Sequence, residues 1–311
     1  MSSKYMGVIL AAGKGSRMHP FSDDFPKPLL PICNMPLIEY QLNMMNEVGI
    51  KDVIVLIGHH GAKIVNHLGD GKRFGLKINY VEQKNMLGIA HAVGMLEEYI
   101  SEPFLLFLGD IFFITKDLST MFHEFEHNKI NAVLATKTEK NRDAIKRNFA
   151  IIENKEGFIE RVIEKPRYII NDLKGCGLYL FDLHIFDAIR RTPRTAMRDE
   201  YELTDSIQIL IDDGFKVKKS NIILEDLNLT NPGDLLAINL QELKRRKLTQ
   251  LLAKKVGLRS KKKILNSIIG QNVVVENDIC IQNSVVFADT IVKQKSTIKN
   301  SILYLNKTIS C

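Results

Sequence analysis

A regular alternation of apolar strand candidates with amphipathic helix candidates runs through the first half of the chain and limits its fold more than any other feature. The segments are Met6–Ala11, Met35–Val48, Val53–Ile57, Ala62–Leu68, Ile78–Val81, Ile89–Tyr99 and Phe104–Leu108. This spacing indicates right-handed βαβ units and hence an α/β domain with a mostly parallel sheet. Ligands of such open sheets bind beyond the carboxyl ends of the strands. We therefore expect the residues just after Ala11, Val81 and Leu108 to face one cleft.

The middle of the chain is predicted to continue this domain, with short strands over Val133–Thr136, Ala150–Ile152 and Gly177–Phe181. A polar helical connector is expected over Gln241–Lys263. These patterns divide the chain into a large domain of residues 1–240, a basic helical linker of residues 241–263 and a tail of residues 264–311.

In the tail, apolar residues recur at six-residue steps. One series is Ile269, Val275, Ile281 and Phe287, and the other is Val273, Ile279, Val285 and Ile291. A short period of this kind is typical of a parallel β-helix, here of two or three coils. Ordinary strands of a small sheet are the alternative. Because so short a coil leaves open ends, we expect a homo-oligomer that covers them.

The composition is that of a globular protein with a sizeable core, at 311 residues with 45% hydrophobic and 25% charged residues. The four cysteines are scattered without C-x-x-C spacing, which predicts free thiols in a reducing cytoplasm. No signal-like or membrane-spanning apolar stretch is present in the sequence, so no membrane association is expected.

Much of the net charge of +7 lies in one basic run. Its members are Lys244, Arg245, Arg246, Lys247, Lys254, Lys255, Arg259, Lys261, Lys262 and Lys263. No aromatic residue interleaves with this run, whereas stacking on single-stranded bases needs aromatic side chains. A solvated helix and linker is therefore favoured over a nucleic-acid surface, and the positive charge suits substrates rich in phosphate.

A glycine-rich loop directly follows the first strand, in the run Leu10-Ala-Ala-Gly-Lys-Gly-Ser-Arg17. Gly13 and Gly15 would let backbone N–H groups approach a polyphosphate, and Arg17 adds a fixed charge. The loop matches neither the dinucleotide fingerprint nor the P-loop, and by itself an ordinary βα turn is equally plausible. Downstream, prolines flank Lys27 in Phe25-Pro-Lys-Pro-Leu-Leu-Pro-Ile32, which makes sense if this lysine must point at a phosphate.

These two motifs, followed by Met35-Pro-Leu-Ile, resemble the signature of the sugar-phosphate nucleotidylyltransferases, the family of glucose-1-phosphate thymidylyl- and uridylyltransferases. The similarity continues to about residue 240. The tail resembles the left-handed β-helix that is often appended to these enzymes. The resemblance implies a Rossmann-like domain with a short C-terminal left-handed parallel β-helix. We expect the nucleotide to contact Leu10, Ala11, Ala12, Gly13, Gly15 and Ser16, with Arg17 and Lys27 as catalytic cations.

Two further motifs lie at predicted strand ends. Gln83 can donate and accept hydrogen bonds at once, as a pyrimidine edge requires, and Gly88 allows close approach of the main chain. A surface glutamine and a helix-starting glycine are the alternative. The resemblance implies that both residues read the base. For His91, a structural role is favoured over a catalytic one.

Asp110 ends a buried apolar strand, where a cap or turn role is the plain alternative. Phosphate chemistry needs hard oxygen ligands for a metal ion, and the resemblance implies that Asp110 binds Mg²⁺. The family's second aspartate aligns with Asn228. An amide oxygen can still bind Mg²⁺, although the exchange lowers the negative charge of the site.

For the acceptor, Glu164-Lys165-Pro166 matches the family's E-K-P, which implies that Lys165 binds the sugar phosphate and Glu164 the sugar hydroxyls. From the residues alone, a surface strand end is favoured. The run from Gly175 to Tyr179 resembles the strand against which the sugar lies. Ala150 stands where relatives usually have glycine. The motif Glu200-Tyr-Glu-Leu-Thr-Asp205 resembles the family's next stretch, and it fits a helix start equally well.

The expected activity is transfer of a nucleoside monophosphate from a nucleoside triphosphate, dTTP or UTP, to a sugar 1-phosphate, glucose 1-phosphate being favoured. Mg²⁺ is the expected cofactor and pyrophosphate the second product. A non-catalytic regulatory or scaffold subunit is the alternative, favoured by Asn228 and Ala150. Acyl transfer by the tail is disfavoured, because the tail is short and lacks histidine.

Overall fold

The computed structural model describes residues 4–127, 129–196, 199–258, 263–293, 297–305 and 307–311. The chain forms two compact units. The first, here called the sheet unit, comprises residues 1–13 and 41–226, and the second, the coil unit, comprises residues 14–40 and 227–311.

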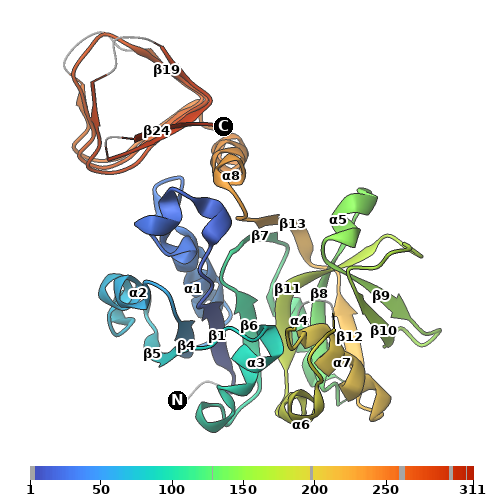
Figure 1. The fold of residues 1–311 in the computed structure, drawn as a ribbon. Coiled ribbons are helices and arrows are strands. Elements are labelled where there is room, and N and C mark those ends of the chain that lie inside the picture. The colour runs from blue at the N-terminus through green and yellow to red at the C-terminus, as the bar shows by residue number, and fades with distance from the viewer. Residues whose placement is uncertain (1–3, 128, 197–198, 259–262, 294–296, 306) are drawn as a thin grey trace. The chain divides into compact units, whose positions relative to one another are not determined.

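The core of the sheet unit consists of four parallel strands in the order β6-β1-β4-β5 (Figure 1). They are β1 (Met6–Ala11), β4 (Asp52–Ile57), β5 (Lys77–Glu82) and β6 (Phe104–Leu108). The helices between them are α1 (Leu37–Glu47), which begins in the coil unit, α2 (Gly61–Leu68) and α3 (Ile89–Gly94). The sequence pattern predicted each of these strands and helices, because every segment has one buried apolar face or is buried on both faces.

The second half of the sheet runs largely antiparallel, which the sequence pattern did not predict. It contains β8 (Ala132–Thr138), β9 (Phe149–Glu153), β10 (Ile159–Glu164), β11 (Leu173–Phe181) and β12 (Val217–Ser220). Strand β11 is antiparallel to β6, β8 and β9, while β12 is parallel to β8. A tight turn at Gly157 (φ 80°) joins β9 to β10, so no helical crossover is available to make that pair parallel. The sheet of the described residues is therefore mixed, with a parallel core.

Helices and a small ribbon complete the sheet unit. The helices are α4 (Ser119–Glu126), α5 (Arg142–Lys146), α6 (His184–Arg191) and α7 (Leu203–Asp212). Strands β7 (Ile111–Thr115) and β13 (Ile223–Asn228) pair as a two-stranded sheet. An apolar cluster that includes Val8, Leu106, Phe181 and Ile207 forms part of the interior.

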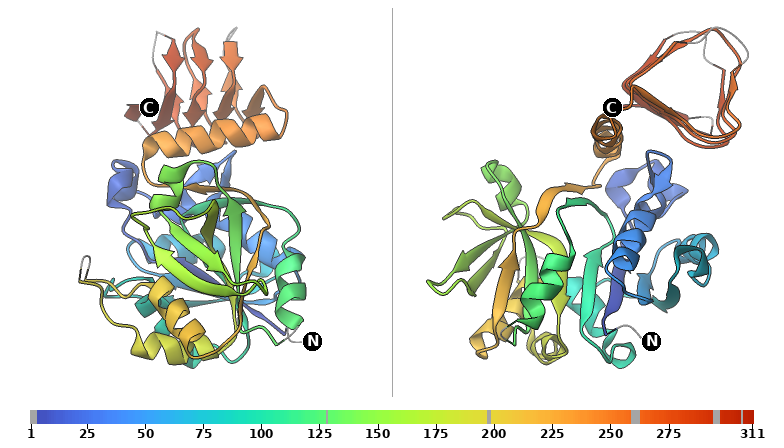
Figure 2. Two further views of the ribbon diagram at one scale, coloured as in Figure 1. Left: turned by 90° about the vertical axis from the view of Figure 1, so that its right-hand side faces the viewer. Right: turned by 180° about the vertical axis from the view of Figure 1, so that it is seen from behind.

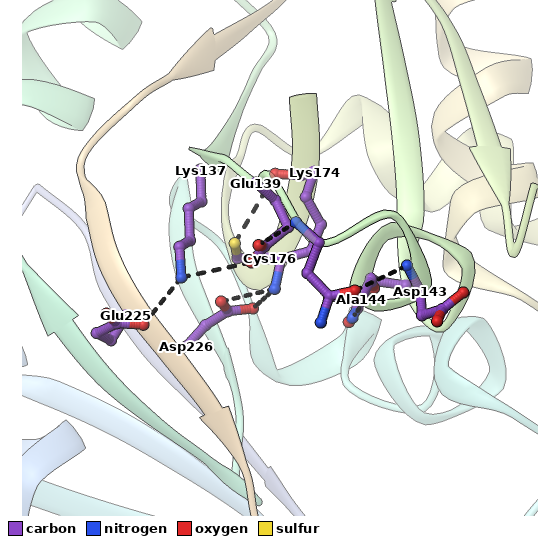
Figure 3. A network of polar contacts seen from close by, with 10 residues as sticks. Lys137, Glu139, Asp143, Ala144, Lys174, Cys176, Glu225 and Asp226 are labelled. Atoms are coloured by element: carbon purple, nitrogen blue, oxygen red, sulfur yellow. Dashed lines mark hydrogen bonds and ion pairs between the residues drawn. The ribbon is translucent and has the colours of Figure 1, made fainter. Parts of the chain in front are cut away.

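A buried ion pair fixes β13 against β11 (Figure 3). The Nζ atom of Lys174 lies 2.7 and 2.6 Å from the two carboxylate oxygens of Asp226, and the two side chains are 3% and 1% exposed. Beside them, Lys137 donates to Glu225 over 2.9 Å. Burial raises the pKa of the nearby Cys176 thiol well above its ordinary value. Because Nζ contacts both carboxylate oxygens and the pair is almost fully buried, removal of either partner would leave an unpaired charge in the interior.

In the coil unit, residues 14–40 form three single 3₁₀ turns, at Ser16–Met18, Phe21–Asp23 and Lys27–Leu29. A short ribbon of β2 (Pro31–Ile32) and β3 (Met35–Pro36) follows. Helix α8 (Pro232–Arg245) begins with a capping box formed by Asn231 and Asp234. The helix expected over Gln241–Lys263 ends at Arg245. The basic residues Arg259, Lys261 and Lys262 lie outside the described residues.

The tail folds into three sheets of short strands, which the chain visits in turn (Figures 1 and 2). Parallel partners lie 17 residues apart, as in the pairing of Ile268 with Val285. The first sheet contains β14 (Gln250–Leu252), β17 (Ser267–Ile269), β20 (Val285–Val286) and β23 (Ser301–Tyr304), and the last strand, β24 (Lys307–Ser310), pairs antiparallel with β23. The second contains β15 (Gly257–Leu258), β18 (Val274–Val275) and β21 (Ile291–Val292), and the third β16 (Lys263–Leu265), β19 (Cys280–Gln282) and β22 (Ile298–Lys299).

This coil is compatible with the expected parallel β-helix, whose left hand stays a prediction. All residues of the two apolar series are buried except Ile291, which is 46% exposed. At one corner, Asn266, Asn283 and Asn300 all adopt positive φ and stack through side-chain hydrogen bonds of 2.8 and 3.1 Å. Asparagine tolerates this left-handed conformation better than other non-glycine residues.

All four cysteines carry free thiols, as the sequence predicted. In the described part of the chain, no helix combines the length and apolar character that crossing a bilayer requires.

Candidate functional site

One edge of the sheet gathers the predicted residues of the sheet unit. Leu108, at the end of β6, lies beside Leu10 of β1. In turn, Ile57 of β4 lies beside both Ala11 and Glu82. Gly13, Gln83 and Asp110 therefore follow strands that end at the same edge, as the βαβ pattern predicted.

The antiparallel strands bring the acceptor motifs to this edge. Leu178 of β11 lies beside Phe107 of β6, so Gly175, three residues earlier, lies just beyond the end of β6. Phe149 of β9 pairs with Gly175 on one side and with Glu164 on the other. Glu164 and Lys165 thus end β10 at the level where Asp110 follows β6.

Glycines let neighbouring strands approach the end of β1 closely. A Cβ atom at Gly58 would lie 2.6 Å from the Ala12 carbonyl oxygen, and one at Gly109 would lie 2.5 Å from the Leu10 carbonyl oxygen. The Gly109 N–H also donates to Leu10 over 2.9 Å. Gly58 was not among the residues predicted from the sequence, although its place directly after β4 mirrors that of Gly109 after β6.

The turn that carries Asp110 is held by Gln41 of α1. The Gln41 amide donates to the carbonyl oxygens of Leu108 and Ile111, on both sides of the turn, over 2.9 and 3.0 Å. Gln41 is 1% exposed, and its own carbonyl oxygen has no hydrogen-bond partner among the described residues. A buried acceptor without a partner costs free energy. That Gln41 is nevertheless present indicates that the two hydrogen bonds from its amide nitrogen to Leu108 and Ile111 are needed. Sequence reasoning missed Gln41, because nothing local marks a contact that spans 67 residues.

The predicted base reader Gln83 is buried and contacts His91. Its Nε2 atom lies 3.2 Å from Nδ1 of His91, and its backbone N–H donates to Ile57 over 2.8 Å. Because an amide nitrogen can only donate, Nδ1 of His91 is the acceptor of this hydrogen bond. His91 therefore orients the glutamine, which extends the structural role expected for it.

Gly88 is required by the backbone of Tyr201. Gly88 has φ 109°, and a Cβ atom there would lie 2.4 Å from the Tyr201 carbonyl oxygen. Tyr201 also donates to Leu87 over 2.7 Å and accepts from Ala90 over 3.0 Å. The motif Glu200–Asp205 is thus hydrogen-bonded through Tyr201 to the start of α3, a contact that the sequence did not predict.

The acceptor motif is tied to α7 and carries backbone strain. The Thr204 hydroxyl donates to Glu164 over 3.3 Å, and Nζ of Lys165 lies 3.8 Å from the same carboxylate group. Lys165 adopts φ 42°, a left-handed conformation that costs a non-glycine residue on the order of 1–3 kcal/mol. Its N–H donates to Asn148 over 2.8 Å. Strain of this kind clusters at functional sites.

The residues below this motif are buried packing residues. A Cβ atom at Gly175 would lie 1.9 Å from the Phe149 ring, so this glycine makes room for an aromatic side chain. The Tyr179 ring stacks on Phe149 with centroids 6.2 Å apart, and burial raises the Tyr179 pKa above its ordinary value. Ala150 is 4% exposed. Tyr179 and Ala150 therefore lie under the edge, with little surface for a ligand.

The coil unit holds the remaining predicted residues of the glycine-rich loop. Gly15 has φ 64°, and a Cβ atom there would lie 2.9 Å from Cγ of Lys27, so the lysine stem lies across the loop. Arg17 is exposed in the 3₁₀ turn that Gly15 begins. At Gly13, which ends the first segment of the sheet unit, an added Cβ atom would meet no described atom within 4 Å, and this leaves room for a ligand.

Asn228 is the exposed last residue of β13. The nearby Asp234 is occupied by the helix cap, where its carboxylate accepts from Thr230 and Asn231, each over 2.9 Å. Among the described residues, no three His, Cys, Asp or Glu side chains form a group that could hold a metal ion. Asp110, in the sheet unit, and Asn228, in the coil unit, each carry a hard oxygen donor, the kind of ligand that Mg²⁺ takes together with waters and substrate phosphates.

Comparison with known proteins shows one family. Residues 6–224 match the nucleotidyl transferase family. The low-salt glycan biosynthesis nucleotidyltransferase Agl11 of Haloferax volcanii is 35% identical over 68% of this chain and 58% of its own length. A glucose-1-phosphate thymidylyltransferase of Streptomyces griseus is 34% identical over 75% of this chain and 64% of its own length. The match thus spans less than two thirds of either relative.

A solved structure supports the fold. UDP-glucose pyrophosphorylase, complexed with UDP-glucose, superimposes with a TM-score of 0.68 at 22% identity. The superposition covers 79% of this chain and 100% of that one.

Proposed function

The chain belongs to the nucleotidyl transferase family, and we propose that it transfers a nucleoside monophosphate from a nucleoside triphosphate to a sugar 1-phosphate, with release of pyrophosphate. The observation that carries this proposal is the common sheet edge, at which a buried amide, a carboxylate and the Glu164–Lys165 motif follow different strands. We favour dTTP or UTP as donor and glucose 1-phosphate as acceptor.

The nucleotide would be bound by the end of β1, the glycine-rich loop and Gln83. In this proposal Leu10, Ala11, Ala12, Gly13, Gly15 and Ser16 offer backbone groups to the triphosphate. The Gln83 amide, oriented by His91, retains one N–H and its carbonyl oxygen for the base, which suits the paired donor and acceptor of uracil or thymine. Gly88 would keep the adjoining main chain close to the base.

The acceptor would be bound by Lys165 through its phosphate and by Glu164 through sugar hydroxyls, with Gly175, Tyr179 and Ala150 packed beneath these two residues as their support. The ordered Thr204–Glu164 contact supports this assignment, because it fixes the carboxylate that must read the sugar.

The reaction needs no protein nucleophile. An oxygen of the sugar phosphate attacks the α-phosphorus in line, the bond from that phosphorus to the bridging oxygen breaks, and pyrophosphate leaves with the bonding electrons. Arg17 would stabilise the leaving pyrophosphate, Lys27 the α-phosphate and Lys165 the attacking phosphate. Asp110 and Asn228 would hold Mg²⁺, which supplies charge neutralisation when bound.

A matched pair of lysine variants tests the proposal. The full chain is incubated with Mg²⁺, glucose 1-phosphate and either dTTP or UTP, and pyrophosphate release is measured. We expect Lys27→Met to lower the rate on the order of 10²-fold, because it removes a charge from the transition state. Lys14→Met, in the same loop, serves as the control and should retain its rate.

A wild-type chain that releases no pyrophosphate from any common pairing of triphosphate and sugar phosphate would favour the alternative, a non-catalytic regulatory or scaffold subunit. The departures at Asn228 and Ala150 are the features that support that alternative. A single matrix of triphosphates against sugar 1-phosphates decides between the two and identifies the base and the sugar.

We further propose a cytoplasmic homo-oligomer whose tail is a left-handed β-helix. Four free thiols fit a reducing compartment. The partners would be the two substrates and further copies of the chain, with neither nucleic acid nor a membrane involved.

A further inference from the structure

An aromatic cluster joins the tail to the N-terminal segment of the coil unit. Phe21 stacks on Phe287 with centroids 5.5 Å apart and lies 4.8 Å from the ring of Tyr304. Phe25 lies 6.1 Å from both tail rings. Phe21 is fully buried, and Phe287 and Tyr304 are 6% and 1% exposed. Four rings from two distant parts of the sequence thus form one small core.

Polar contacts fix the orientation of this cluster. The Tyr304 hydroxyl donates to the Pro20 carbonyl oxygen over 3.0 Å and accepts from Lys307 over 3.2 Å. Lys307 also lies 3.8 Å from the Asp24 carboxylate. A hydroxyl has a single proton, and the Tyr304 hydroxyl donates it to the Pro20 carbonyl oxygen. The positive charge next to the Asp24 carboxylate comes from Lys307. The tail therefore contacts the segment through its backbone as well as its rings.

The segment so held is the one that carries the proposed phosphate-binding cations. Arg17 lies three residues before Pro20, and Lys27 two residues after Phe25. Between them the described chain makes single 3₁₀ turns, closed by bonds such as Asp24 N–H to the Phe21 carbonyl oxygen over 3.0 Å. Isolated turns of this kind have little stability of their own. Their conformation must come from packing.

Further contacts hold the segment downstream of Lys27. Asn34 donates to the Ile269 carbonyl oxygen of the tail over 3.0 Å. The fully buried Asn239 of α8 accepts from the Cys33 N–H over 2.8 Å and donates to the Pro31 carbonyl oxygen over 2.9 Å. The segment is thus bound to the C-terminal part of the chain on both sides of Lys27.

We propose that Phe287 and Tyr304 are positioning residues for the nucleotide-binding segment, so that the tail serves as a scaffold for Arg17 and Lys27 in addition to any role in assembly. This inference rests on the proposed function, since it assigns phosphate binding to those two cations. It assigns a role in substrate binding and turnover to residues more than 250 positions away in the sequence.

Three variants of the full chain test the proposal. Tyr304→Phe removes the hydrogen bonds and keeps the ring, whereas Tyr304→Leu and Phe287→Leu remove a ring each. Leu303→Ala is the matched control, because Leu303 neighbours Tyr304 in β23 but packs into the apolar interior of the coil. The control separates loss of coil stability from loss of contact with the segment.

Two measurements are made on each variant. Hydrogen exchange followed by mass spectrometry reports the protection of peptides from residues 14–30, and it does not depend on activity. Kinetics report kcat and the KM for each substrate. We expect faster exchange in those peptides and a loss of about 10- to 100-fold in kcat/KM for the triphosphate, since small displacements of positioning groups have effects of this size. The KM for the sugar phosphate should change little.

The control and the proposed function lead to distinct outcomes. Leu303→Ala should leave the exchange of residues 14–30 and the triphosphate KM close to wild type. Wild-type exchange and wild-type kinetics in both Tyr304→Leu and Phe287→Leu would overturn the inference. If the wild-type chain has no activity, the proposed function fails, while the exchange comparison still decides whether the tail orders the segment.

Discussion

At the scale of single residues, the proposed site at the sheet edge depends on supporting side chains as much as on the residues proposed to bind the substrates and the metal ion. Gln41 bridges the two carbonyls that flank the Asp110 turn, and His91 fixes the amide of Gln83. Supporting hydrogen bonds of this kind decide whether a metal ligand or a base reader is already in its working orientation.

Gln41→Leu should weaken metal binding without changing the ligand set. The substitution removes both donors to the turn and leaves two buried carbonyls unpaired, so the Asp110 carboxylate is no longer held in place. We expect the affinity for Mn²⁺, measured by electron paramagnetic resonance in the presence of a nucleoside triphosphate, to fall about 10-fold or more.

Asn131→Leu is the control for Gln41→Leu. Asn131 also supports a turn, by donating to Asp182 over 2.8 Å, but it precedes β8 at the opposite edge of the sheet. The Asn131→Leu variant should be less stable than wild type but should keep the wild-type affinity for Mn²⁺. Equal Mn²⁺ affinities in Gln41→Leu and wild type would show that the turn does not need this support.

The sequence predicted the candidate residues at the ends of strands, but it did not predict the supporting residues of other elements that contact them. Gln83 and Asp110 were predicted because an apolar run ends just before each, and Glu164 was predicted because Glu164-Lys165-Pro166 matches the family's E-K-P. The assignment of Gly175 to the sugar site stays a prediction, and the structure adds that the Phe149 ring occupies the place of a side chain at Gly175. That contact joins two strands, so no local pattern marks it.

At the scale of helices and strands, the parallel core was predictable and its antiparallel extension was not. Amphipathic periodicity identifies β1, β4, β5, β6 and the helices between them, but it carries no information on the direction of β11, which is buried along almost all of its length. The 17-residue repeat of the coil was visible in the sequence as six-residue steps, because the core residues Ile269, Val275 and Ile281 lie six positions apart and only the step to Val286, which pairs with Ile269, is shorter.

The ion pair of Lys174 and Asp226 is the contact between strands whose loss we expect to lower stability most. Lys174→Met should lower the free energy of unfolding by about 3–5 kcal/mol, because it leaves Asp226 buried and unpaired between β11 and β13. Urea unfolding followed by circular dichroism measures the loss.

Lys174→Met combined with Asp226→Leu should recover most of that loss, since an apolar pair of similar volume has no buried charge. A double variant as unstable as the single one would mean that the two residues act through different neighbours. Because Lys174 and Asp226 are in direct contact, their effects are not additive, and comparison of the single and double variants measures the interaction between them.

At the scale of the whole molecule, the first coil is the surface best suited to assembly. Strands β14 and β16 pair on one side only within the described residues, and three leucines there, Leu248, Leu252 and Leu265, are 40%, 39% and 38% exposed. A groove of about 810 Å³ beside them is lined by Lys244, Lys247 and Leu248 among others. Unpaired strand edges with apolar side chains favour association.

Leu252→Glu combined with Leu265→Glu should convert the proposed oligomer into monomers, because each change places a charge on the apolar edge. Sedimentation velocity measures the outcome. Leu305→Glu, at the other end of the coil and 52% exposed, is the control and should remain assembled. Dissociation by the control alone would place the interface at the other end of the coil. A monomeric wild type would contradict the proposed oligomer itself.

The Asn34, Phe21 and Phe25 contacts reach Ile269, Phe287 and Tyr304, which belong to three successive turns of the coil. Repeats of this type usually tolerate gain or loss of a turn, since each touches only its neighbours. Here an added or deleted turn between Ile269 and Tyr304 would shift the anchor points against a segment that cannot stretch with them. The spacing of these three turns is therefore matched to the segment of residues 21–34, and lengthening would be tolerated only outside the turns that this segment contacts.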